Sequence, residues 1–151
     1  MARFAGEHTE TFTLDVPLER ARAHFRSFDN IVANFSQLER HEKLDDDTLR
    51  FLLLPQNALG ATFRGKYDCR YSFPSENVLA WKTVSADANI FADGSATFTS
   101  LGASRTRVVY TQKLEMEIPV NRLVGRAIAP LVKREIVAGV KAYLDRMRRA
   151  L

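Results

Sequence analysis

Apolar and polar side chains alternate almost without exception between residues 63 and 73, FRGKYDCRYSF. One parity holds Phe63, Gly65, Tyr67, Cys69, Tyr71 and Phe73, and the other holds Arg64, Lys66, Asp68, Arg70 and Ser72. This period of two is typical of a strand with one face in water. Tyrosines, a thiol and a glycine are an unusual lining for a dry core. We therefore interpret the inner face of this strand as one wall of a cavity.

The chain before this strand first predicts a strand and two helices. Residues 11–17, TFTLDVP, alternate as a strand that ends at Pro17, and proline suits the first turn of a following helix. Apolar side chains then recur at helical spacing over 18–28. A second short helix is predicted over 28–37, with Asp29 as its N-cap.

A run of strands follows the helices. Residues 38–44 and 48–54 predict a hairpin whose turn is the acidic trio 45–47, and a loop over 55–61 leads into the alternating strand.

Three more strands complete the sheet. A turn at 74–77 precedes a strand over 78–85, and the strands 89–101 and 106–118 pair across the turn 102–105. One face of the last strand carries Val108, Tyr110, Gln112, Leu114, Met116 and Ile118.

The period changes after Pro119, where the chain predicts one long amphipathic helix capped by Asn121. Its apolar stripe comprises Val124, Ile128, Leu131, Val132, Val137, Val140, Leu144 and Met147. A helix of this length spans roughly 45 Å. Pro130 is expected to kink it or to mark a break near Arg126, whose carbonyl loses its partner.

Composition fits one ordinary globular domain over residues 1–151, with 46% hydrophobic and 26% charged residues. No run reaches the roughly 20 apolar residues of a membrane span, and the first ten residues lack the apolar core of a secretion signal. The single cysteine, Cys69, cannot form an internal disulfide. We therefore expect a cytoplasmic protein.

The net charge of +4 is unevenly distributed. Residues 120–151 contain eight Lys or Arg against two acidic residues, a net charge of +6 that leaves −2 for the remainder. Such asymmetry can mark a surface for nucleic acid, anionic lipid or an acidic partner. The basic residues are not regularly interleaved with aromatic ones as single-strand binders need, so we favour a solvated helix face and do not expect a nucleic-acid partner.

The order of elements resembles the helix-grip fold of the START/Bet v 1-like (SRPBCC) superfamily, which includes polyketide cyclases and lipid-transfer domains. Residues 12–31, FTLDVPLERARAHFRSFDNI, carry the opening strand, proline and helix, and residues 119–147 carry the closing basic amphipathic helix with its glycine and proline. The first helical region lacks the tryptophan common in many members, and Phe35 stands in that region.

The resemblance implies an α+β fold in which a curved antiparallel sheet of seven strands wraps around the closing helix, with a hydrophobic cavity between them. The residue pattern leads to the same arrangement, because a sheet with one polar face must cover the other and only the closing helix is long enough to do so. The cavity wall is then expected to include Phe63, Tyr67, Cys69, Tyr71, Trp81, Phe98, Tyr110, Gln112, Ile128, Val132 and Ile136.

The polar members of this wall leave two interpretations open. Tyr67, Tyr71, Tyr110 and Gln112 either hydrogen-bond one another or reach the rim, or they orient a carbonyl or hydroxyl of a ligand. Trp81 is equally compatible with plain core packing.

No catalytic residue can be assigned from the sequence. His8, His24 and His41 have no metal-ligand spacing, either with one another or with Cys69, and His24 is expected at the surface or its boundary. Cys69 faces inward without a readable neighbouring base, and the trio 45–47 is best explained as a solvated turn. No cofactor or metal is expected.

Three functions remain open. The leading one is a binding or carrier domain for an apolar, lipid-like or polyketide-like small molecule. The second is a cyclase or dehydratase in which cavity tyrosines polarise a carbonyl. The third is an interaction module that uses the basic closing helix. The fold alone does not choose among them.

Overall fold

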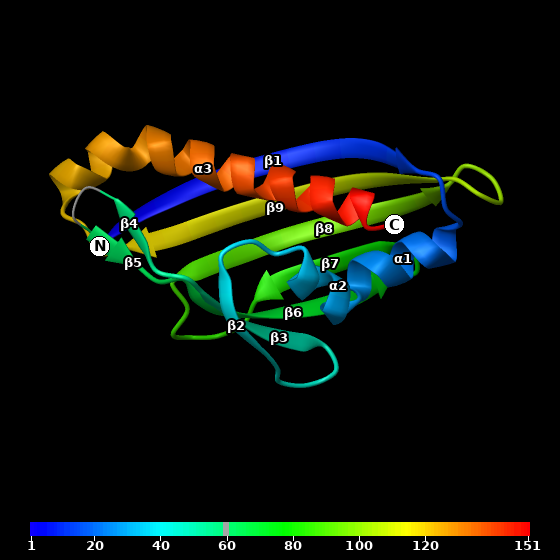
Figure 1. Ribbon diagram of the computed structural model, residues 1–151, viewed down its shortest axis with the longest axis horizontal. Helices are drawn as coiled ribbons and strands as arrows, with labels where there is room; N and C mark the ends of the chain where they lie inside the picture. The colour runs from blue at the N-terminus through cyan, green and yellow to red at the C-terminus, as the bar shows by residue number, and fades with distance from the viewer. Residues whose placement is uncertain (59–60) are drawn as a thin grey trace.

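A seven-stranded antiparallel sheet forms the body of the protein in a computed structural model that describes residues 1–58 and 61–151 (Figure 1). Its strands follow the spatial order β1-β9-β8-β7-β6-β3-β2. Their bounds are β1 Ala2–Leu14, β2 Leu38–Lys43, β3 Thr48–Leu53, β6 Lys66–Ser75, β7 Val78–Thr83, β8 Ile90–Ser100 and β9 Thr106–Ile118. The predicted α+β helix-grip architecture is confirmed, including the seven strands and the two short helices after the first.

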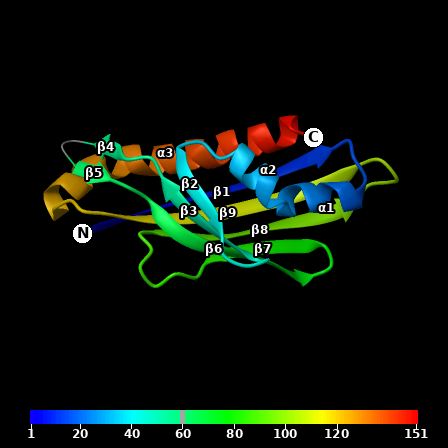
Figure 2. The same ribbon diagram turned by 60° about the horizontal axis from the view of Figure 1, so that its bottom comes forward.

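The long helix α3 (Arg122–Arg149) runs along one face of the sheet (Figures 1 and 2). Asn121 is its N-cap as predicted, since the side-chain oxygen of Asn121 accepts a hydrogen bond from the backbone N–H of Val124 at 2.8 Å. The helix continues through Pro130 without interruption, so the predicted break is absent. Helix and sheet thus form the two layers that bound the site.

Two short helices, α1 (Leu18–Arg26) and α2 (Phe28–Ala33), lie near the C-terminal end of α3 (Figures 1 and 2). The prediction of Asp29 as the cap of α2 is wrong. Ser27 is the N-cap, and its hydroxyl accepts from the backbone N–H of Asn30 at 3.2 Å. Asp29 lies in the first turn instead, where a carboxylate complements the helix dipole.

Strand β1 is longer than the sequence pattern indicated. Apolar and polar residues do not alternate regularly in its N-terminal half, so the pattern did not predict that part as a strand. It pairs with β9, and its residues Gly6, His8 and Glu10 lie opposite inward-facing residues of β9. Gly6 lets α3 approach closely, since a Cβ there would lie 2.6 Å from a methyl carbon of Ile136.

The loop predicted over 55–61 and the residues after it form a small separate hairpin of β4 (Gln56–Ala58) and β5 (Ala61–Phe63). Residues 59 and 60 of that loop lie outside the described chain. The predicted strand 63–73 is therefore divided, and β6 begins only at Lys66. At the division, a Cβ on Gly65 would collide with the side chains of Ile90 and Leu53. A larger residue here would force these two side chains to shift where the chain passes against β8.

The inward parity of β6 is confirmed for its central residues. Tyr67, Cys69 and Tyr71 are buried, whereas the alternate residues are exposed apart from Asp68, which is half-buried and forms an ion pair with Arg50 at 2.8 Å. The prediction fails at Phe73, which is 37% exposed because the strand has run past the core. No helix in the described part of the chain is long and apolar enough to cross a membrane.

Candidate functional site

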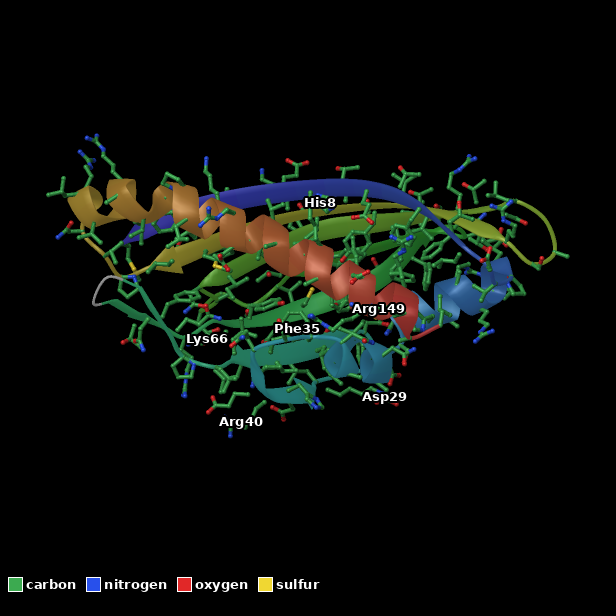
Figure 3. All side chains as sticks on the ribbon, turned by 45° about the horizontal axis from the view of Figure 1, so that its top comes forward. His8, Asp29, Phe35, Arg40, Lys66 and Arg149 are labelled. Atoms are coloured by element: carbon green, nitrogen blue, oxygen red, sulfur yellow. The ribbon has the colours of Figure 1, made fainter. Side chains whose placement is uncertain are left out.

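A cavity of about 680 Å³ lies between the sheet and α3. It falls within the usual range of small-molecule pockets. Strands β6 to β9 contribute its floor, and α3 contributes its roof. In Figure 3, Phe35, which also lines the cavity, lies between α3 and the strands β2 and β3, whereas Arg40 lies at the outer edge of the molecule.

Most of the predicted wall residues meet in this cavity. Those that line it are Phe63, Tyr67, Cys69, Tyr71, Trp81, Tyr110, Gln112, Val132 and Ile136. Phe98 and Ile128 do not line it. Phe98 packs against Phe25, with ring centroids 5.9 Å apart, and Ile128 belongs to a second apolar cluster at the N-terminal end of α3. Both face inward as expected, but they pack against other side chains and do not line the cavity.

The sequence pattern missed several lining residues on the helices and connections. These are mainly Phe25 on α1, Phe35 after α2, and Leu131, Glu135, Tyr143 and Arg146 on α3. Phe35 and Tyr143 contact each other, with ring centroids 5.9 Å apart. The aromatic residues of the helical segments were a readable signal, but their direction depends on how the helices dock.

Aromatic rings form two groups around the cavity. On the floor, Trp81 lies between Tyr71, at 6.0 Å between centroids, and Tyr110, at 5.1 Å. On the side, Phe51 stacks on Tyr67 at 4.8 Å and contacts Phe35 at 4.9 Å. Such pairs stabilise the packing of the walls.

The amide of Gln112 is occupied by protein partners. The indole N–H of Trp81 donates to the Gln112 side-chain oxygen at 2.7 Å, and the Gln112 amide donates to the carbonyl of Lys113 at 2.8 Å. For Gln112, the interpretation that buried polar groups satisfy one another is therefore supported.

The tyrosine hydroxyls differ from Gln112. Those of Tyr67, Tyr110 and Tyr143 form no hydrogen bond to any residue that the structure describes, although all three side chains line the cavity. Burial raises the pKa of each of them, and that of Tyr71, above the ordinary phenol value. They therefore stay protonated and present O–H donors to the cavity.

Cys69 is buried, and its thiol is unreactive. Desolvation raises its pKa to about 12, with Tyr71 and the backbone of Lys82 acting weakly in the opposite direction. A thiolate nucleophile is therefore not present at neutral pH.

The opening of the cavity is marked by lining residues that are also exposed. Leu54 is 41% exposed and Leu131 is 42% exposed, and both line the cavity. The opening thus lies between α3 and the chain that joins β3 to β4. Among the described lining residues, Glu135 and Arg146 are the only charged ones.

The structure also shows where His24 and His8 lie. His24 is buried and not at the surface, because it joins the helices: its Nε2 lies 2.7 Å from the carbonyl of Met147, and its Nδ1 lies 3.1 Å from the amide of Asn30. His8 lies on β1 beside Glu10, outside the cavity lining (Figure 3). The described residues contain no cluster of three or more His, Cys, Asp or Glu that could hold a metal ion.

Several solved structures share this architecture. The Zhui aromatase/cyclase from Streptomyces sp. R1128 superposes with a TM-score of 0.70 at 14% identity, over 97% of this chain and 93% of that one. A START superfamily protein from Mycobacterium smegmatis gives a TM-score of 0.61 at 14% identity, over 96% and 99% of the two chains. The chain has the START/Bet v 1-like helix-grip fold.

The same fold is shared with a norcoclaurine synthase from Thalictrum flavum, solved with a transition-state analogue, at a TM-score of 0.61 and 7% identity over 99% of this chain and 96% of that one. The sequence matches no family model and no curated protein. At these identities the likeness extends to the helix-grip fold alone.

Proposed function

We propose that residues 1–151 act as one cytoplasmic domain that binds an apolar small molecule carrying a hydrogen-bond acceptor, such as a carbonyl oxygen. The ligand occupies the cavity between the sheet and α3, with the predicted wall residues as its contacts. The observation that carries the proposal is the set of cavity-facing tyrosine hydroxyls without partners in the described chain. These hydroxyls open onto the cavity, where a ligand oxygen can accept a hydrogen bond from them in place of water.

The size and lining of the cavity support the same function. About 680 Å³ accommodates a drug-sized molecule, and most lining side chains are aliphatic or aromatic. The fold is also that of an aromatase/cyclase and of a synthase. A polyketide-like or lipid-like body is the class of ligand that these walls accept.

A cyclase or dehydratase activity is the second candidate, because the unpartnered hydroxyls could polarise a carbonyl. Such a reaction also needs a group that removes a proton. Among the described lining residues the only carboxylate is that of Glu135, an exposed residue of α3, and no histidine lines the cavity. Binding without chemistry is therefore the function we favour.

The basic face of α3 supports an interaction role less well. Arg148 pairs with Glu10 at 3.2 Å, and Arg149 pairs with Asp145 at 2.5 Å. Part of the positive charge is thus neutralised within the chain, and the remainder is spread along a solvated helix.

The proposal is tested with the substitution Tyr110→Phe and a matched pair of ligands, acetylnaphthalene and ethylnaphthalene, which differ by one carbonyl oxygen. Trp81 is the only tryptophan and lines the cavity, so its fluorescence reports binding. We expect the variant to bind the ketone more weakly by about 0.5–1.5 kcal/mol, the net value of one hydrogen bond, and to bind the hydrocarbon unchanged.

The thermal midpoint of Tyr110→Phe is expected to match the wild type, because the hydroxyl has no partner in the described chain. A lower midpoint with unchanged affinities would show that the hydroxyl serves folding alone. Native mass spectrometry of protein purified from its host completes the test. If no small molecule co-purifies and neither naphthalene changes the fluorescence of Trp81, the proposal is wrong.

A further inference from the structure

Arg146 differs from the other α3 arginines without an acidic partner in the described chain, Arg122, Arg126 and Arg134, because it is half-buried and they are exposed. Among the described residues it takes part in no ion pair, whereas the neighbouring Arg148 and Arg149 both do. Its one side-chain hydrogen bond runs from Nε to the backbone carbonyl of Asn34, at 2.8 Å. A half-buried guanidinium is thus held in place without a counter-charge.

One nitrogen of this guanidinium has lost water without gaining a partner. Nη2 of Arg146 is buried and has no hydrogen-bond acceptor in the described chain. A buried donor on a charged group costs more than a neutral one when it is unpaired. Arg146 also lines the cavity, and an acceptor there can approach Nη1, the guanidinium nitrogen that is neither buried nor hydrogen-bonded in the described chain.

The carboxylates of Asp145 and Glu10 do not pair with Arg146. Asp145 binds Arg149, and Glu10 binds both His8 and Arg148. The other charged lining residue, Glu135, lies eleven positions earlier on α3, about 16 Å away along the helix axis. The cavity therefore has a positive end at Arg146 and a negative end at Glu135.

We infer that the ligand of this cavity is an amphipathic acid whose carboxylate binds Arg146 while its apolar body fills the space between α3 and the aromatic floor. The fixed Nε–Asn34 contact orients the guanidinium, and a carboxylate can then bond to Nη1 in the charge-assisted geometry that arginine favours. Glu135 repels the acid at the other end and so sets the direction of binding. This inference rests on the proposed function and adds the ligand's charged group to it.

The experiment uses two acid–amide pairs of nearly equal shape, decanoic acid with decanamide and naphthylacetic acid with naphthylacetamide. Calorimetry at neutral pH and low salt measures their affinities for the wild type. We expect the better-fitting acid to bind about tenfold more tightly than its amide, because a charge-assisted contact is roughly twice as strong as a neutral one.

The variant Arg146→Gln is expected to abolish this preference. Its affinity for the acid falls about tenfold, while its affinity for the amide changes by no more than about threefold. Arg146→Lys keeps the charge without the arginine fork and is expected to restore part of the preference. Thermal melts of both variants confirm that they fold.

The matched control is Arg134→Gln, which removes an exposed positive charge of α3 that does not line the cavity. We expect it to keep the full acid preference. If it loses the preference as Arg146→Gln does, the general positive field of the helix is responsible and the inference is wrong.

Two further outcomes separate this inference from the proposed function. Equal binding of acid and amide by the wild type would overturn the role of Arg146 and leave the apolar binding site standing. Failure of all four compounds to bind, together with no co-purifying molecule, would overturn both.

Discussion

The indole N–H of Trp81 on β7 donates a hydrogen bond to the side-chain oxygen of Gln112 on β9, 2.7 Å away across strand β8. Gly94 of β8 lies between them, paired with Trp81 on one side and with Gln112 on the other. The absence of a side chain on Gly94 gives the indole room to lie across β8. This contact fixes the floor of the cavity and uses the polar group of Gln112 within the protein.

Replacing Gln112 with Leu is expected to lower the free energy of unfolding by about 1–3 kcal/mol, because the indole N–H of Trp81 loses its acceptor. Trp81→Phe leaves the oxygen of Gln112 unpaired and has a cost of the same kind. The double variant should be more stable than the sum of the two losses predicts, because neither polar group remains. Urea unfolding of the four proteins measures this coupling, and strictly additive losses would contradict it.

The substitution Gly94→Ala should destabilise the fold by about 1–3 kcal/mol, the usual cost of overpacking. A Cβ on Gly94 would lie 2.5 Å from atoms of the Trp81 indole. The tryptophan emission should shift as the ring moves. The matched control is Gly139→Ala on α3, where a Cβ meets nothing within 4 Å. That change should stabilise the helix by up to about 1 kcal/mol, and equal effects at the two glycines would contradict the packing shown.

Stability should fall in alkaline solution. Burial raises the pKa of Cys69 from its ordinary 9.0 to about 12, and it raises the pKa of Tyr67, Tyr71 and Tyr110 above 10.0. Above about pH 9 the unfolded chain releases protons that the folded chain retains, so unfolding becomes easier as the pH rises. Below that pH this contribution to stability is fully present.

Urea unfolding measured from about pH 8 to about pH 11 checks this dependence, with a loss of at most about 1.4 kcal/mol per pH unit for each titrating group. In Cys69→Ala the fall that begins near pH 9 should be shallower. A free energy of unfolding that stays flat over this range would show that these groups are solvated in the folded protein.

His24 should contribute to the docking of α1 against the end of α3. Its substitution by Leu removes the contacts to the carbonyl of Met147 and to the amide of Asn30, and we expect a loss of about 1–3 kcal/mol. His41→Leu is the control, because His41 is exposed on the edge strand β2 and its replacement should change stability by less than about 0.5 kcal/mol. A similar effect of both substitutions on the thermal midpoint would contradict the role assigned to His24.

Local patterns in the sequence determined most of the architecture. The strand over 106–118, the hairpin around the acidic trio and the cap at Asn121 follow from alternation, turn residues and capping chemistry, all of which act between neighbours in the chain. The inward direction of Tyr67, Cys69 and Tyr71 followed from the same parity. The prediction that Phe73 faces the core was wrong, because parity gives the face of a strand but not the point at which the core ends.

Only the tertiary structure decided what the inward residues meet. The sequence pattern could not separate Phe98 and Ile128, which are packed, from Tyr110, which lines the cavity, because the difference is set by where the helices dock. The acceptor for the Trp81 indole is Gln112, thirty-one residues away, and the burial of Arg146 depends on α3 meeting Asn34 at the end of α2, which happens only in the fold. Burial and hydrogen bonding are sums over neighbours in space, and a linear pattern does not contain them.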